Sequence, residues 1–184
     1  MKSHTRTNTS AGRAFYKHGN KKIYVEPLDN IIAVRYREGT KTDVCRALRS
    51  LGQVQAKESQ RLAIVQFSDA SQREEALQLL QQWLDDGVIE FVTPVLRDPE
   101  SGLSQILTDE IAVRFKSVLP SKHLRAVEQK YGVTVARQNE FVPTQCIMKV
   151  TQPKGLHTLE VASQLDAAKE VEFATPNFIS EHQR

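Results

Sequence analysis

Hydrophobic positions along the chain change their period several times, and each change marks an expected element. Apolar side chains alternate with others over residues 32–36, which predicts a strand with one face on a core. Val44, Leu48 and Leu51 then recur at helical spacing, and Gly52 follows, as at the end of a helix. Further patterns predict strands over 53–56 and 62–67, a helix behind a capping box at 71–74, and a strand over 88–92. The expected order of elements is βαββαβ.

The same pattern returns roughly eighty residues later in the chain. IAVRY at 32–36 becomes IAVRF at 111–115, and VIEFVTP at 88–94 becomes EVEFATP at 170–176. A unit of this length is too long for a solenoid repeat and long enough to hold a core of its own. The pattern therefore predicts that one small domain has been duplicated.

The expected fold class is α+β, with two tandem ferredoxin-like βαββαβ sandwiches whose helices cover one face of an antiparallel sheet. The expected divisions are a flexible basic tail at 1–21, a first unit at 22–96, a linker at 97–106, a second unit at 107–178 and a C-terminal tail at 179–184.

Helices on one face of such a sheet leave the other face open. In each unit the first and third strands are central, so their outward residues are expected on this open face. Candidates are Arg35 and Arg37 in the first unit and Ile147 and Lys149 in the second. A mixed apolar and basic sheet face suits docking of a protein better than catalysis.

Basic residues gather at the N-terminus. Residues 1–22 contain six Lys or Arg and no acid, and the formal net charge of the chain is +3, so 3 − 6 leaves −3 for the remainder. This segment lacks the apolar run of a secretion signal, and the chain has no stretch of apolar residues long enough to span a bilayer. We therefore expect a cytoplasmic location and no membrane partner.

No residue pattern indicates a catalytic, metal or cofactor site, so we expect no cofactor and no enzymatic activity. The five histidines do not stand at ligand spacing, and the eight glycines form no phosphate-binding loop. Cys45 and Cys146 are expected to be buried thiols rather than a disulfide. A nucleophile built from Cys146 with His123 or His157 is disfavoured, because Cys146 lies within an apolar strand and no helix N-terminus would lower its pKa.

The same topology carries the common RNA-recognition module, which stacks bases on aromatic side chains of two central strands. Tyr36 and Phe115 fall in the core-facing register instead. The corresponding outward stretches lack aromatic residues: 32–34, 61–65, 111–113 and 146–148. Nucleic acid is therefore not a favoured partner, and RNA binding stays a third hypothesis that rests on topology and the basic tail.

Three stretches of the second unit carry a family resemblance. LTDEIAVRF at 107–115, KYGV at 130–133 and VEFATPNF at 171–178 together resemble the N-terminal propeptide of subtilisin-like serine peptidases, in its fervidolysin-like form. The resemblance covers residues 105–180, with Thr175 where an acid is usual in the family. The first unit is similar to a diverged second copy.

The resemblance implies a peptidase as the partner. No stretch resembles the catalytic aspartate, histidine or serine motifs of that family, so we expect either a prodomain that acts in trans or the N-terminal portion of a longer peptidase that acts in cis. The open sheet face with Ile147 and Lys149 would pack on the peptidase, and the segment after the last strand would enter its substrate cleft as an added strand.

By position, the family resemblance assigns two roles near the C-terminus. Pro176, Asn177 and Phe178 would direct the exit of the chain from the last strand. The substrate subsites would receive Ile179, Ser180, Glu181, His182, Gln183 and Arg184.

The favoured hypothesis is a propeptide-like inhibitor or folding chaperone of a subtilisin-like serine peptidase. The alternative is a non-catalytic module that recruits another protein through its duplicated sheet faces. Thr175 and the divergence of the first copy motivate that alternative.

Overall fold

The structure is a computed structural model that describes residues 14–18 and 21–180. Over these residues the chain forms nine β-strands, four α-helices and one 3₁₀ turn. In chain order they are β1 Ala14–His18, β2 Lys21–Tyr36, α1 Lys41–Arg49, β3 Gln53–Lys57, the 3₁₀ turn Glu58–Gln60, β4 Leu62–Gln66, α2 Ala70–Asp85, β5 Ile89–Arg97, β6 Ser104–Phe115, α3 Ser121–Tyr131, β7 Val133–Gln138, β8 Gln145–Val150, α4 His157–Asp166 and β9 Val171–Ser180.

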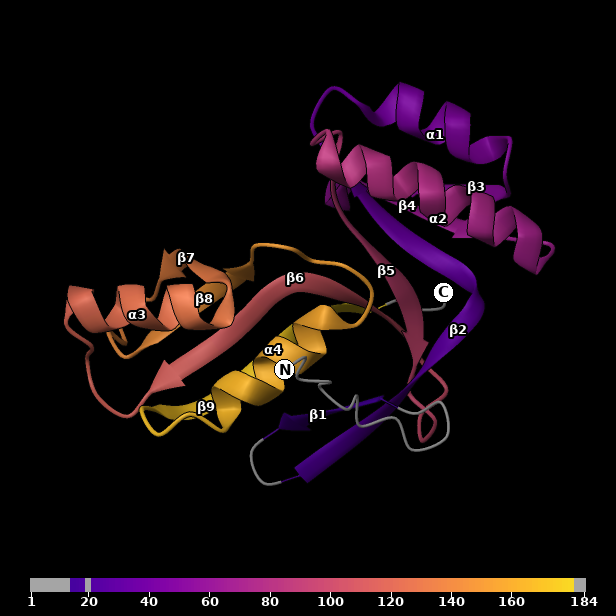
Figure 1. Cartoon of the computed structure of the whole chain (residues 1–184). Coiled ribbons are helices and arrows are strands. Elements are labelled where there is room, and N and C mark those ends of the chain that lie inside the picture. The colour runs from indigo at the N-terminus through magenta and orange to yellow at the C-terminus, as the bar shows by residue number, and fades with distance from the viewer. Residues whose placement is uncertain (1–13, 19–20, 181–184) are drawn as a thin grey trace, which may run out of the picture.

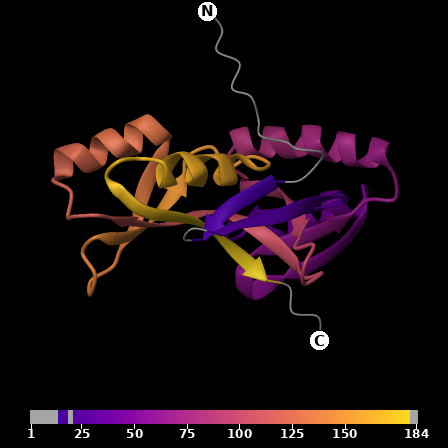
Figure 2. The same ribbon diagram turned by 90° about the horizontal axis from the view of Figure 1, so that it is seen from below.

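All the strands belong to one antiparallel sheet, which confirms the expected mixed α and β structure (Figure 1). Its order is β3-β4-β2-β5-β6-β8-β7, with β1 beside β2 and β9 beside β6. The first half, through β5, has the order β3-β4-β2-β5, and the second half, from β6 onward, has the matching order β7-β8-β6-β9. Helices α2, α3 and α4 lie on the same side of the sheet (Figure 2).

A tight hairpin joins the two halves, where the sequence indicated a linker at 97–106. Residues 95–97 of β5 pair with residues 104–106 of β6, so the sheet is continuous across the join. Gly102 has φ +73°, and Asp98 closes the turn by accepting hydrogen bonds from the Ser101 hydroxyl and the Glu100 amide. These bonds lower the pKa of the Asp98 carboxyl.

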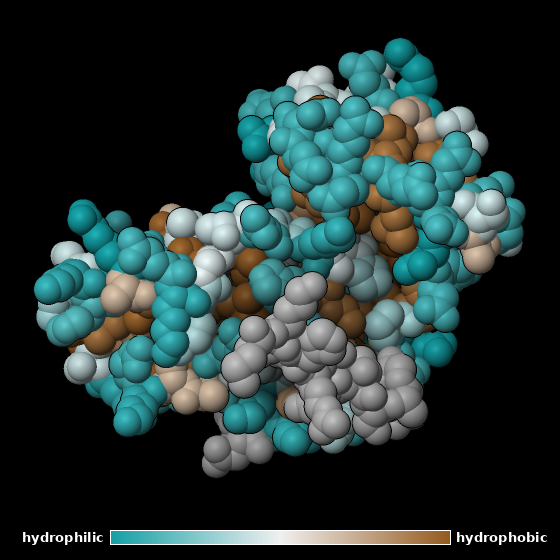
Figure 3. Space-filling view, in the orientation of Figure 1, coloured by the Kyte–Doolittle hydropathy of each residue, from teal (hydrophilic) through white to brown (hydrophobic). Residues whose placement is uncertain are grey.

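The halves form two lobes with apolar surface between them (Figure 3).

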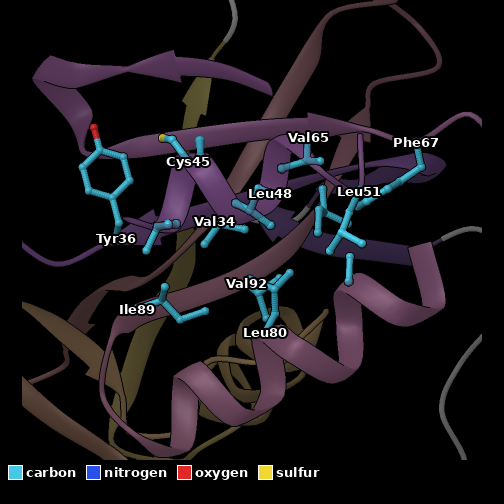
Figure 4. Packing of buried hydrophobic residues seen from close by; sticks show 14 residues of the cluster. Val34, Tyr36, Cys45, Leu48, Leu51, Val65, Phe67, Leu80, Ile89 and Val92 are labelled. Atoms are coloured by element: carbon cyan, nitrogen blue, oxygen red, sulfur yellow. The ribbon is translucent and has the colours of Figure 1, made fainter. Parts of the chain in front are cut away.

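Each half has its own core between its helices and its sheet. In the first half, Leu48 of α1 and Leu80 of α2 point toward Val34 and Val65 of the sheet (Figure 4). The second core is built alike, with Val127 of α3 and helix α4 packed on alternate residues of β6, β8 and β9. Tyr36 and Phe115 lie in these two cores, as their register predicted.

The first helix turn of α2 differs from its predicted form. The cap is Asp69 rather than a residue of the 71–74 box, and its carboxylate accepts a hydrogen bond from the Gln72 amide at 2.9 Å. The Gln72 side chain in turn accepts from the Ser68 amide at 3.1 Å. The helix cap is therefore Asp69, two residues before Ser71, the first residue of the predicted capping box. Aspartate satisfies the free amides at a helix start at least as well as serine does.

A third packed region lies at the centre of the molecule and includes residues that the sequence placed in a tail. Residues 14–18 of the predicted tail at 1–21 form β1, which pairs with the start of the long strand β2. Tyr16 of β1 is buried with Val25, Leu96, Leu107 and Leu159 of α4. Burial of an aromatic side chain explains why this short segment is held as a strand. Residues 1–13 lie outside the described part of the chain.

Candidate functional site

One sheet face in the second half lies away from α3 and α4, and the described residues leave it partly exposed, although Thr175 contacts β1. Ala112 of β6 pairs with Ile147 of β8 on one side and with Thr175 of β9 on the other, and all three are partly exposed. Arg114 pairs with Phe173 in the same way, so the two side chains share this face. We call Ala112, Arg114, Ile147, Phe173 and Thr175 the open face.

The open face has an apolar centre and a charged margin. Ile147 and Phe173 supply partly exposed apolar surface, and Arg114 forms an ion pair with Glu172 at 3.2 Å. Exposed ion pairs contribute little to stability. A partly exposed apolar centre with a polar rim is the composition of a protein-docking surface.

The matching face of the first half is closed. Its central residues Ala33, Ile64 and Phe91 occupy the register positions of Ala112, Ile147 and Phe173, but all three are buried. They form one cluster with apolar residues of the second half, Ile106 of β6 and Ile179 of β9. The expectation of an open face in the first half, based on Arg35 and Arg37, is therefore wrong.

Arg35 and Lys149, both predicted on open faces, meet at a residue that the sequence did not single out. Asp109 of β6 is 5% exposed and lies 3.7 Å from the Arg35 guanidinium and 3.3 Å from the Lys149 ammonium. Arg35 also stacks on the ring of Phe91 at 4.7 Å. Lys149 thus sits between the halves rather than free on the open face. Arg37 is exposed and lines the cleft between the halves.

The predicted exit residues lie within the last strand. Strand β9 runs to Ser180, and Ile179 and Ser180 pair with Ile106 and Gln105 of β6. The buried Pro176 pairs with Ile111. Because Ile179 also packs on the first half, the C-terminal tail expected at 179–184 can begin only after Ser180.

Asn177 fixes the path of this strand. Its carbonyl accepts from the Thr108 hydroxyl at 3.0 Å, and its side-chain amide donates to Glu110 at 3.2 Å. The Phe178 ring packs against the Tyr16 ring at an interplanar angle of 44°, with ring centroids 4.8 Å apart. The remaining predicted subsite residues, Glu181, His182, Gln183 and Arg184, lie outside the described residues.

Strand β1 contacts α4 and β9 of the second half. These residues are far apart in the chain, so no local sequence pattern indicated the contact. Lys17 forms an ion pair with Asp166 of α4 at 3.0 Å, and its carbonyl accepts from the Thr175 hydroxyl at 3.4 Å. Burial of Tyr16, with a smaller effect of Asp98, raises the pKa of the Tyr16 phenol. The threonine that departs from the family pattern therefore contacts the N-terminal strand.

Cys146 lies in the second core, and we expect it to be unreactive. Burial raises the pKa of its thiol to about 11, so on the order of one molecule in a thousand carries the reactive thiolate at pH 8. Cys45 is also buried and free. Labelling of native protein with a thiol reagent at pH 8 should be at least about 100-fold slower than labelling in denaturant. Fast modification of one thiol in the native protein would contradict this.

Over residues 14–18 and 21–180 there is no group of three or more His, Cys, Asp or Glu side chains that could hold a metal ion. None of the helices in this part of the chain is long and apolar enough to cross a membrane.

Comparison with known proteins finds one family match. A family model described as the fervidolysin N-terminal prodomain matches residues 98–177. This part of the chain is therefore similar to the prodomains of subtilisin-like peptidases. The match includes strand β6, all of the open face and most of β9, and it covers less than half of the chain.

The other comparisons add little. No curated protein matches the chain. Among solved structures, the small subunit of acetolactate synthase from Thermotoga maritima is 12% identical over 84% of this chain and 98% of that chain, with a TM-score of 0.28. A TM-score this low does not establish a common fold.

Proposed function

We propose that this protein is a non-catalytic, propeptide-like inhibitor or folding chaperone of a subtilisin-like serine peptidase. The carrying observation is the contrast between the two sheet faces: among the described residues, the face in the prodomain-like region is partly exposed, whereas its counterpart in the first half is buried. An apolar face that the described part of its own chain leaves partly exposed is available for a partner.

We further infer that the chain consists of two tandem ferredoxin-like units that arose by duplication. The pairs Arg35 with Phe91 and Arg114 with Phe173 occupy the same register positions. Each unit also has a register irregularity immediately after that pair, at residue 36 in one and at 115 in the other. Agreement in strand order, register and irregularity supports a common origin of the two units, because bulges are retained within families.

The proposed contact has two parts. The open face would pack on helices of the peptidase, with Ile147 and Phe173 as apolar anchors and Arg114 at the margin. Residues 181–184 would continue from β9 into the substrate cleft and add to the peptidase as an extended strand. The bonds of Asn177 to β6 would fix the direction in which this tail leaves.

Removal of residues 181–184 tests the tail. We expect inhibition of a subtilisin-like peptidase to weaken at least about tenfold, because a strand added in the cleft contributes several backbone hydrogen bonds. The truncation point is Ser180, since Ile179 pairs with β6 and packs on the first half. The measurement is the inhibition constant of both proteins.

A protein with residues 181–184 replaced by a Gly-Ser segment of equal length is the matched control for chain length. Circular dichroism and thermal unfolding of both variants should match the parent, because the truncated residues follow the last strand. Unchanged inhibition constants of both folded variants would show that residues 181–184 do not contribute to inhibition.

The alternative function is recruitment of another protein by the open face alone. The observation in its favour is that residues 176–180 are held within β9 and are therefore not free to enter a cleft. A recruitment module should still bind its partner without residues 181–184. It should lose this binding when a charged residue is introduced at the apolar centre of the open face. A peptidase inhibitor should be weakened by both changes.

A further inference from the structure

A groove crosses the boundary between the two halves on the helix side of the sheet. Its volume is about 780 Å³, and one wall is helix α2 while the other is the segment before α4. We call it the α2 groove. Its apolar lining includes Ile32, Leu77, Val92, Pro94 and Leu156. Apolar surface is visible between the lobes in this region in Figure 3.

The second wall is fastened to the sheet, so the groove is preformed. The Gly155 amide donates to the Val92 carbonyl at 3.2 Å, and the Thr93 hydroxyl donates to the Gly155 carbonyl at 3.3 Å. Residue 154 also forms an isolated parallel bridge with Val92. These contacts fasten the segment at residues 154–155 to β5, the strand against which α2 also packs. A preformed site binds a ligand without a cost for ordering its walls.

Two polar atoms on the α2 wall are buried and have no hydrogen-bond partner: Arg73 Nε and Gln81 Oε1. The Gln81 amide nitrogen donates to Asp85 at 3.0 Å, which fixes the amide orientation and leaves its oxygen as the unused acceptor. Both residues line the groove, with Leu77 between them at helical spacing. Buried polar groups without partners are rare in folded proteins and call for a ligand or water.

The two atoms define the ligand that the groove would accept. Eight residues of helix separate Arg73 from Gln81, which corresponds to about 12 Å. An extended peptide advances about 3.3 Å per residue, so three to four residues span this distance. Such a peptide can offer an acceptor to Arg73, an amide donor to Gln81 and apolar side chains to the lining between them.

Charge sets the direction of this peptide. Arg73 lies in the N-terminal part of α2, where the helix dipole adds positive potential, whereas Gln81 and Asp85 lie near its negative end. Glu74 and Lys154 also line the groove, but both are exposed to solvent. A terminal carboxylate therefore fits at Arg73, and the amide groups of the preceding residues fit toward Gln81.

We propose that the α2 groove binds the free C-terminal end of an extended apolar peptide, with the carboxylate at Arg73 and a backbone amide at Gln81. This site is separate from the open face, since it lies on the helix side of the sheet and is lined mainly by the first half. It does not depend on the proposed peptidase partner.

The test is fluorescence anisotropy with a labelled tetrapeptide, Leu-Val-Ala-Leu, with a free carboxyl terminus. The same peptide with a C-terminal amide, which lacks the terminal negative charge, is the comparison ligand. We expect the full chain to bind the acid roughly ten- to a hundredfold more tightly than the amide, as for a charge-assisted hydrogen bond. Arg73→Met should remove this preference, and Leu77→Glu should abolish binding of both peptides.

Arg46→Met, at an exposed arginine of α1, is the matched control and should bind like the parent. Each variant is first shown to retain its circular dichroism spectrum and unfolding midpoint, and Gln81→Leu supplies a second independent change on the same wall. Equal affinity for the acid and the amide, or binding unaffected by Arg73→Met and Leu77→Glu, would overturn the proposal. Binding that appears only after deletion of residues 1–13 would also overturn it, because the groove would then belong to the chain's own N-terminus.

Discussion

Replacement of Asp109 by Ala is expected to lower the free energy of unfolding by about 3 kcal/mol, because it leaves a buried cation without its counter-charge. Arg35, whose side chain is only 14% exposed, would lose its acidic partner while it stays packed on Phe91. Lys149 is more exposed and can turn to solvent. The measurement is equilibrium unfolding in urea at neutral pH.

The exposed pair Arg114 with Glu172 supplies the control. Glu172→Ala removes a carboxylate from an ion pair of 3.2 Å between exposed side chains, and it should cost less than about 1 kcal/mol. The double change Arg35→Met with Asp109→Leu should recover part of the stability, since an apolar pair of similar volume removes both buried charges. If Asp109→Ala costs no more than Glu172→Ala, the buried cluster does not hold the halves together.

Glutamate substitutions at two matching isoleucines should have opposite consequences. Ile64 and Ile147 occupy the same register position in the two halves, opposite Ala33 and Ala112. Ile64 is 7% exposed and packs in the cluster between the halves, so Ile64→Glu should cost about 4 kcal/mol or more as a buried charge without a partner.

Ile147 is partly exposed, so Ile147→Glu should change the free energy of unfolding by only about 1 kcal/mol. The same change should weaken peptidase inhibition at least about 100-fold, since it places a charge at the centre of the proposed apolar contact. Unfolding curves and inhibition constants of both variants test this pair of predictions.

Gln129→Glu is a matched control for the added charge, because Gln129 lies exposed on helix α3, on the other side of the sheet from the open face. It should leave inhibition within about threefold of the parent, a difference under 1 kcal/mol. Retained inhibition by folded Ile147→Glu would show that the open face is not the contact surface. A stable Ile64→Glu would show that the first-half face is not closed in solution.

The N- and C-terminal strands meet in this fold, and their contact bears on the proposed mechanism. Tyr16 packs against Phe178, and the Lys17 carbonyl accepts a hydrogen bond from the Thr175 hydroxyl. These contacts and the pairing of β9 with β6 together hold the strand from which the tail leaves. A tail that leaves a fixed strand loses less entropy on entering a cleft than a free one does.

Local patterns in the chain were enough to predict most elements and their order. The mostly apolar stretch at 62–67 behind a polar turn and the helical spacing of Val44, Leu48 and Leu51 identified β4 and α1 to within a few residues. Such patterns are local, because a residue's side of a strand or helix depends on its near neighbours in the chain. The repeat of IAVRY as IAVRF in the same way indicated two similar halves and the core positions of Tyr36 and Phe115.

Which of the two matching sheet faces is covered depends instead on contacts between distant parts of the chain. Ile64 is buried and Ile147 is partly exposed, although both strands have a similar pattern, because Ile106 and Ile179 pack over one and not the other. Other contacts likewise join residues far apart in the chain: the ion pairs of Asp109, the contacts of β1 with the second half, and the pairing of β9 with β6 as far as Ser180. Burial and pairing at such distances depend on how the whole sheet bends, which no short window of sequence contains.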